Sequence, residues 1–183
     1  SLLESKSIDE VFEIGCGTGK LLDFIEPNIY IGFDTNYESL KLLKNKFHNA
    51  LCIHGDGLSL PVSDSSVNCI VCIHTLEHIY DLAKFFDEIK RILKANGIFI
   101  FAIPTEGGLA WKYGRNFVTG PHLKSKYNLD VHHIMEREHI NDANRVLKFI
   151  KFYFNYSKIF YWPFNFLKIL SLNSTIYGYC VNK

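Results

Sequence analysis

Short apolar runs alternate with amphipathic runs along the first hundred residues, and this alternation constrains the fold more than any other feature of the sequence. The apolar runs are rich in Ile, Val, Phe and Cys and nearly continuous, which is typical of strands buried on both faces of a parallel sheet. Five such alternations predict an α/β fold with a doubly wound, mostly parallel sheet of Rossmann type. The five expected strands are residues 9–15, 29–34, 49–56, 67–74 and 98–104.

The helix-like runs have recognisable ends. A short helix is expected over residues 19–26, where Pro27 stops it. An amphipathic helix is expected over residues 36–47, with Asn36 as its N-cap.

The clearest helix signal spans residues 81–97, because apolar side chains line one face and Asn96 with Gly97 supplies a stop. A further helix is expected over residues 141–150. The apolar face of the first helix comprises Leu82, Phe85, Phe86, Ile89, Ile92 and Leu93, and that of the second comprises Ala143, Val146, Leu147 and Ile150.

The alternation breaks after residue 104. Residues 105–140 are rich in glycine and polar residues, and a long irregular insertion in a compact domain is usually a lid or binding loop. Residues 155–162 and 174–181 then read as the sixth and seventh strands. We therefore expect one domain over residues 1–183, with a seven-stranded sheet, an antiparallel terminal strand and a lid after the fifth strand.

Charge and cysteine content exclude several classes of protein. The net charge of the 183 residues is only +1, which disfavours a nucleic-acid partner. The odd count of five cysteines argues against a disulfide framework and fits a reducing cytoplasm. Cys69 and Cys72 lie three apart on a strand and should point to opposite faces, so they cannot share a metal. No uncharged apolar run reaches the length of a membrane span.

The first expected strand ends in the loop E-x-G-x-G-x-G, which runs from Glu13 to Gly19. A phosphate-binding P-loop requires Ser or Thr after Gly-Lys, and Leu21 stands there instead. A dinucleotide fingerprint requires a third glycine where this chain has Lys20, so a nicotinamide dinucleotide is only the alternative ligand. The Glu13 carboxylate would repel a diphosphate and would suit an ammonium or a sulfonium.

Two further carboxylates follow the second and third strands. Asp34 lies about 20 residues after the first glycine, where a carboxylate can accept hydrogen bonds from both ribose hydroxyls. Asp56 can accept from the exocyclic amino group of a purine, and Leu58 could pack on the purine face. Sites for an amino acid, a ribose and an adenine together imply S-adenosylmethionine.

At these residues the sequence resembles the class I S-adenosylmethionine-dependent methyltransferases. The matching stretches are "FEIGCGTG", "GFD", "GDGLSLPVSDSSVNCIVCIHTLEHI" and "LKANGIFIFAIP", within residues 10–104. The resemblance is to the small-molecule type, similar to the ubiquinone-biosynthesis group. It implies S-adenosylmethionine as cofactor, S-adenosylhomocysteine as product, and a cofactor site made of Glu13, Gly15, Cys16, Gly17, Asp34, Thr35, Asp56, Gly57, Leu58 and His74.

The acceptor is less constrained than the donor. A sulfonium methyl is already activated, so an enzyme mainly aligns the nucleophile and excludes water, and an oxygen nucleophile also needs a base. The Asn/Asp-Pro-Pro-aromatic tetrad of DNA amino-methyltransferases is absent, since "IHTLEH" follows the fourth strand. We expect transfer to an oxygen or nitrogen of a small molecule. A catalytically silent cofactor-binding module is the alternative.

Histidines supply the candidates for a base or a metal ligand. His78, and His132 or His133 within the expected lid, are the candidate general bases. The run "HTLEHI" resembles an E-x-x-E-H metal motif in which His74 replaces the first Glu. Glu77 and His78 could then bind a cation, although we assign no metal ligand, because both residues could instead cap the following helix. His122, His132, His133 or His139 could complete such a site.

Aromatic residues are dense near the end of the chain, over residues 149–166. Core packing is the simplest explanation of this density. Contact with a membrane surface or a homodimer interface is the alternative, because exposed apolar patches usually mark partners. The oligomeric state is accordingly left as monomer or homodimer. In the insertion, Trp111, Tyr113 and Arg115 are candidates to line an acceptor site.

Overall fold

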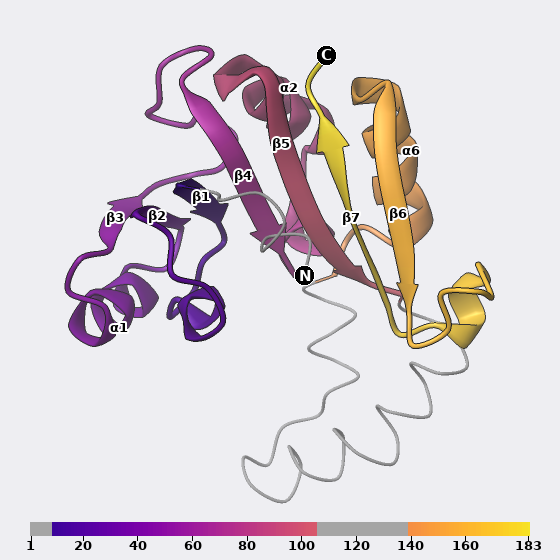
Figure 1. Cartoon of the computed structure of the whole chain (residues 1–183), viewed down its shortest axis with the longest axis horizontal. Coiled ribbons are helices and arrows are strands. Elements are labelled where there is room, and N and C mark those ends of the chain that lie inside the picture. Colours follow the sequence, from indigo (N-terminus) through magenta and orange to yellow (C-terminus); the bar gives the residue numbers. More distant parts are fainter. Residues whose placement is uncertain (1–8, 106–138) are drawn as a thin grey trace, which may run out of the picture.

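A computed structural model describes residues 9–105 and 139–183 of the chain. Its seven strands form one sheet in the order β3-β2-β1-β4-β5-β7-β6 (Figure 1). The pairs among β1 to β5 are parallel, and β7 runs antiparallel to both of its neighbours. The doubly wound, mostly parallel fold predicted from the sequence is therefore confirmed. The strands are β1 Glu10–Ile14, β2 Ile29–Asp34, β3 Leu51–His54, β4 Val67–Ile73, β5 Leu93–Pro104, β6 Tyr156–Trp162 and β7 Thr175–Val181.

Helices cover both faces of this sheet. Helices α2 and α6 bury their apolar sides against one face, in a core cluster that includes Phe86, Phe99 and Ile150. On the opposite face, α1 packs through Leu40 and Leu43 against the strands at the β3 end. Figure 1 shows α1 beside β2 and β3 at one end of the sheet and α6 beside β6 at the other. The helices are α1 Tyr37–Lys46, α2 Leu82–Ile92 and α6 Ala143–Tyr153, with 3-10 turns η1 Lys20–Asp23, η2 Leu76–His78 and η4 Leu170–Leu172.

The predicted cap and helix faces are confirmed. The Asn36 side chain accepts a hydrogen bond from the Ser39 amide at 3.1 Å and so begins α1. All the apolar positions predicted for the faces of α2 and α6 are buried. Cys69 and Cys72 belong to the two different core clusters, one on each face of the sheet, and all five cysteines are free.

Two predicted helices are wrong in extent. Residues 19–26 form only the 3-10 turn η1, which buries none of its side chains and therefore lacks the packing that stabilises a longer helix. Helix α2 ends at Ile92 rather than Gly97, because Leu93 already pairs with Val67 and so begins β5. The Ser65 and Ser66 amides cap the helix by donating to the Arg91 and Ile92 carbonyls.

The topology places a ligand site between β1 and β4. Strand β1 pairs with β2 on one side and with β4 on the other, so the strand order reverses there. Open α/β sheets bind ligands at the carboxyl ends of the strands at such a reversal. The predicted lid falls almost entirely outside the described residues, at 106–138. Within the described parts of the chain, no helix is both long enough and apolar enough to cross a membrane.

Candidate functional site

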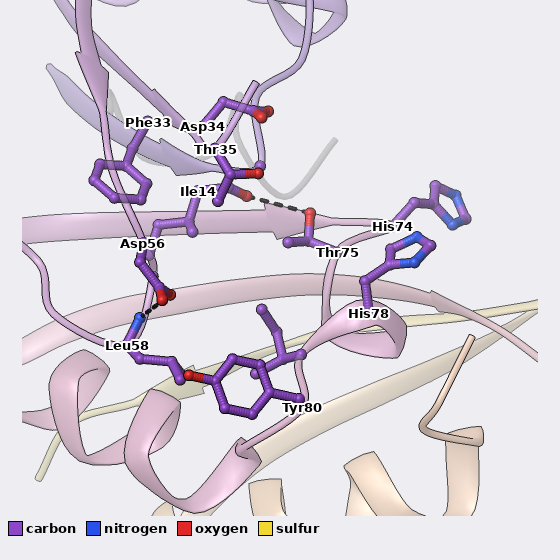
Figure 2. Close-up of a pocket in the computed structure, with 13 residues that line it drawn as sticks. Ile14, Phe33, Asp34, Thr35, Asp56, Leu58, His74, Thr75, His78 and Tyr80 are labelled. Atoms are coloured by element: carbon purple, nitrogen blue, oxygen red, sulfur yellow. Dashed lines mark hydrogen bonds between the residues drawn. The ribbon is translucent and has the colours of Figure 1, made fainter. Parts of the chain in front are cut away.

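A cavity of about 460 Å³ opens at the carboxyl ends of β1 to β4, at the position where the strand order reverses (Figure 2). Each of these four strands contributes residues from its end or from the loop that follows it. The volume is within the range typical of small-molecule sites. The lining residues are Ile14, Gly15, Phe33, Asp34, Thr35, Asp56, Gly57, Leu58, His74, Thr75, His78, Ile79 and Tyr80.

The glycine loop forms one wall and can take no side chain at Gly15. Gly15 has φ +72°, and a Cβ built on it would lie 2.1 Å from Thr75 Oγ1. Gly17 also has positive φ, at +51°, but nothing lies within 4 Å of the position that its Cβ would take. The space beside the Gly17 backbone is therefore open, so a ligand can approach the main chain closely.

Asp34 at the end of β2 is held by two backbone amides. Its Oδ2 accepts from the Gly17 amide at 2.7 Å, and its Oδ1 accepts from the Asn36 amide at 2.8 Å. A carboxylate offers about four lone-pair sites, so each oxygen can accept a further hydrogen bond. The loop and helix α1 therefore fix the orientation of a carboxylate that retains capacity for a ligand.

Asp56 after β3 is fixed in a similar way. Its Oδ1 accepts from the Leu58 amide at 3.0 Å, which closes a turn over Gly57 (Figure 2). Leu58 is buried with 4% of its side-chain surface exposed, yet it borders the cavity. The turn therefore presents a carboxylate and an apolar surface side by side, as the binding of a purine would require.

Glu13 lies beneath the glycine loop and does not line the cavity. Its carboxylate is buried, and the Tyr30 hydroxyl donates a hydrogen bond to Oε2. Burial raises the pKa of Glu13 to about 7; the Tyr30 hydrogen bond opposes this shift, and the Asp34 charge adds to it. Two of the three predicted carboxylates thus border the cavity, and the predicted contact of Glu13 with an ammonium stays a prediction.

Cys16 and Gly17, both predicted to bind the cofactor, also lie outside the lining residues. Burial raises the pKa of the Cys16 thiol, which is only 4% exposed and therefore stays protonated. The lining residues that were not predicted from the sequence are Ile14, Phe33, Thr75, Ile79 and Tyr80. Each lies within two residues of a predicted site residue, so proximity in sequence was the only signal available.

Histidines and a buried glutamate gather at the end of β4. The rings of His74 and His78 lie on one side of the cavity (Figure 2), and His74 adopts φ +52°, unusual for a residue other than glycine. Glu77 Oε1 lies 3.6 Å from His74 Nδ1, whereas Glu77 Oε2 is buried and accepts no hydrogen bond within the described structure. A buried carboxylate oxygen without a partner usually has a structural or chemical reason.

His139 joins this cluster from a distant part of the chain. The Glu77 carbonyl accepts from the amides of Ile140 and Asn141, and the His78 and His139 rings meet edge to face at 4.5 Å. Burial, and then the nearby His78, lowers the pKa of His139 and favours the neutral imidazole. Potential ligand atoms of Glu77, His78 and His139 lie within 4.8 Å of one another, so the three could hold a divalent cation.

The alternative prediction, that Glu77 and His78 cap the following helix, is wrong for α2. Asp81 is the N-cap of α2, and its Oδ1 accepts from the Lys84 amide at 3.0 Å. Glu77 instead anchors the segment that leads into α6, through its backbone carbonyl. His122, His132 and His133 lie outside the described residues, as do Trp111, Tyr113 and Arg115.

Solved structures place this fold in a known class. The chain superposes on a Thermotoga maritima methyltransferase described as a possible histamine N-methyltransferase, with a TM-score of 0.66, 16% identity, and coverage of 95% of this chain and 82% of that one. A Pyrococcus horikoshii protein superposes with a TM-score of 0.66 at 17% identity, covering 100% of this chain and 86% of that one. At such identities the likeness concerns the fold alone.

Sequence comparisons give the family. Residues 12–101 match the profile described as "Methyltransferase domain". A "Probable S-adenosylmethionine-dependent methyltransferase" of Mycolicibacterium smegmatis is 29% identical over 114 residues, 61% of this chain and 44% of that protein. An uncharacterised methyltransferase of Schizosaccharomyces pombe is 37% identical over 90 residues, 48% of this chain and 36% of that protein.

Over residues 12–101 the chain is similar to the S-adenosylmethionine-dependent methyltransferases, and S-adenosylmethionine is the cofactor of that family. The match spans less than half the length of these curated relatives. The residues present suit this cofactor, because the Gly17 backbone is open and two oriented carboxylates border one cavity.

Proposed function

We propose that this chain transfers a methyl group from S-adenosylmethionine to an oxygen or nitrogen of a small-molecule acceptor. The observation that carries the proposal is the pair of oriented carboxylates, Asp34 and Asp56, on one cavity beside the open Gly17 backbone. Neither carboxylate forms an ion pair with a described side chain. Both therefore remain available to accept hydrogen bonds from a nucleoside.

The cavity residues divide into three proposed roles. Asp34, with Thr35, binds the ribose hydroxyls, while Asp56, Gly57 and Leu58 bind the adenine. Gly15, Cys16 and Gly17 form the loop around the amino-acid portion, with Glu13 beneath it. His74 borders the cavity at the end of β4, next to the reacting centre. The bound cofactor supplies an activated methyl group, so the protein has to orient an acceptor and exclude water.

Calorimetric titration with S-adenosylmethionine and S-adenosylhomocysteine tests the binding roles. D34A and D56A should each weaken affinity about 10- to 100-fold, since each removes a charged hydrogen-bond acceptor. E38A is the matched control, because Glu38 is an exposed carboxylate that pairs with Lys41 and with no other residue in the described ranges. Unchanged affinity in both cavity variants would refute the assignment, and tight binding of a nicotinamide dinucleotide would favour the alternative ligand.

The general base is proposed to be His78, His132 or His133. Of these, His78 borders the cavity. An oxygen acceptor needs a base near neutral pH, and a positioned base contributes roughly 100-fold or more to turnover. H78A, or H132A with H133A, should reduce methyl transfer while calorimetry shows unchanged cofactor affinity. A chain that binds cofactor but methylates no acceptor in a broad screen would instead be a silent binding module.

A divalent cation is a second possibility for the His78 cluster, and the unpartnered Glu77 Oε2 favours it. Such a cation would be bound by Glu77, His78 and His139 and could orient an acceptor oxygen. Elemental analysis of the purified protein and activity in the presence of a chelator decide between the two roles. Full activity with chelator and no bound metal would leave His78 as a base rather than a ligand.

A further inference from the structure

The carboxy-terminal described segment is strongly basic. Residues 139–183 contain six Lys or Arg residues and one acidic residue, Asp142, for a net charge of +5. Residues 9–105 contain eight Lys or Arg and thirteen Asp or Glu, for a net charge of −5. The near-neutral total of the chain therefore conceals two segments of opposite sign.

Five basic side chains of this segment are exposed and form no ion pair with a described carboxylate. Asp142 is already engaged as the N-cap of α6, where it accepts from the Arg145 amide at 2.8 Å. In residues 9–105, by contrast, Lys41, Lys46 and Arg91 all form ion pairs with carboxylates. No carboxylate in the described structure forms an ion pair with any of Arg145, Lys148, Lys151, Lys158 or Lys168, all of which are exposed.

Large apolar side chains are also exposed in this segment, at the end of β6 and in the connection between β6 and β7. Phe166 is 81% exposed and Trp162 is 59% exposed. The buried Asn173 holds this connection in shape, since its Oδ1 accepts from the Phe164 amide and its Nδ2 donates to two carbonyls. The exposed apolar residues of the connection, hereafter the aromatic connection, are Trp162, Phe164, Phe166, Leu167 and Ile169, with Lys168 among them.

We propose that the aromatic connection and the basic side of α6 form a docking surface for an anionic lipid bilayer. Apolar side chains that insert below the headgroups, next to lysines that meet anionic lipids, are the composition of an interfacial membrane contact. Leu167 and Ile169 are aliphatic and cannot stack on bases, which favours lipid over a nucleic acid. Figure 1 shows α6 alongside β6 and the connection extending past the end of β6.

The aromatic connection lies toward the same edge of the sheet as the cofactor cavity. Trp162 pairs with Thr175, and Thr175 pairs with Pro104 at the carboxyl end of β5. The cavity opens at the carboxyl ends of β1 to β4, which run parallel to β5. Docking through the aromatic connection therefore brings the edge that carries the cavity toward the bilayer.

Sedimentation of the full chain with lipid vesicles tests this proposal without any cofactor. We expect binding to vesicles of phosphatidylcholine with about one third phosphatidylglycerol, and at least roughly tenfold weaker binding to phosphatidylcholine alone. Binding to the anionic vesicles should fall when salt is raised from about 0.05 to about 0.5 M, because screening weakens the lysine contacts.

Paired variants test the two components of the surface. F166S with I169S should weaken vesicle binding at least about tenfold, because two inserted side chains are lost. K148E with K151E should weaken binding to the anionic vesicles by a similar factor. The matched controls are F24S, at a residue 79% exposed in the acidic segment, and K84E on the exposed side of α2; both should bind as the unmodified chain does.

Several outcomes would overturn the assignment. These are the absence of binding to any vesicle, equal binding by the paired variants and the controls, and binding to RNA or duplex DNA in place of vesicles. Light scattering that shows a dimer abolished by F166S with I169S would assign the surface to a second copy of the chain instead. Circular dichroism and melting curves establish that each variant is folded before binding is compared.

Discussion

Residues 9–105 and residues 139–183 share one sheet but differ in almost every other respect. The first segment contains the whole match to the family profile and all the residues found to line the cavity, and it is acidic, with Lys41, Lys46 and Arg91 in ion pairs. The second lies beyond the profile, is basic, and exposes large aromatic side chains. The difference teaches that the similarity to the methyltransferase family lies in the first segment, whereas the proposed docking surface lies in the second.

The largest effect is expected where the two segments meet. The buried ring of Phe86 on α2 contacts Phe149, Tyr153 and Phe154 of the α6 region. F86A should reduce the free energy of unfolding by about 3–5 kcal/mol, because it leaves a cavity at this junction. Denaturant unfolding should remain a single transition, whereas F24A, at an exposed position, should change stability by less than about 0.5 kcal/mol. Two separate transitions would show that the segments fold independently.

The next largest effect is a pH dependence of the free energy of unfolding, and it arises from Glu13 in the acidic segment. Its pKa is raised from 4.5 to about 7 in the folded chain, so the folded form holds the proton more tightly than the unfolded form. Glu13 should therefore contribute most to stability below about pH 4.5, and this contribution, at most about 3 kcal/mol, should be lost as pH rises through about 7. E13Q keeps an acceptor for Tyr30 but cannot ionise. Unfolding curves at several pH values should show E13Q gaining stability relative to the unmodified chain as pH rises; a constant difference would refute this.

The glycine loop gives a smaller, paired prediction. G15A should cost about 2–3 kcal/mol of stability, because its Cβ would collide with Thr75 and its φ is positive. G17A should cost only about 1 kcal/mol, since nothing is near its Cβ. In calorimetry, however, G17A should weaken cofactor binding, because the added methyl group enters the open space. Normal binding by G17A would show that the ligand does not approach this backbone.

The smallest expected changes in stability come from removing one helix cap in each segment. N36A at the start of α1 and D142A at the start of α6 should each cost about 1 kcal/mol, because each removes one hydrogen bond to a backbone amide. D142A also removes the lone acidic residue of the basic segment, so its vesicle binding should be at least that of the unmodified chain. Melting temperatures measure the first effect, and weaker vesicle binding by D142A would argue against the charge component of docking.

Much of the fold was predictable because its signals are local. The five parallel strands, the Asn36 cap and the apolar face of α2 follow from residue order and spacing, although β3 is a partly exposed edge strand rather than a buried one. The end of α2 was predicted wrongly, because pairing of Leu93 with Val67 depends on the register of a strand 26 positions earlier. No pattern around residues 93–97 reveals that register, and Asn96, at φ +61°, lies with Gly97 inside β5, where its pairing with β4 shifts register.

The residues at the strand ends that line the cavity were predictable, whereas the partners of the buried residues behind them were not. Asp34, Asp56 and His74 border the cavity, because a residue after a parallel strand lies at the ligand-binding edge. Glu13 looked equivalent in sequence, but the hydroxyl of Tyr30 on the neighbouring strand engages its carboxylate beneath the loop. The meeting of His139 with His78 depends on backbone hydrogen bonds between residues more than 60 positions apart, which no local motif encodes.

Thr105 and Asn141, which flank residues 106–138, are each held by hydrogen bonds to other parts of the described chain. The Thr105 amide donates to the Ser174 carbonyl and its hydroxyl to that of Asn173, whereas Asn141 donates to the carbonyls of Leu76, Glu77 and Ile79. Because the residues on either side of this stretch are held by hydrogen bonds to the rest of the fold, we expect that the stretch can be replaced by another sequence while the sheet and its helices keep their structure. Residues 106–138, the predicted acceptor-binding insertion, are thus the part of the chain whose replacement is expected to disturb the sheet and the proposed cofactor cavity least.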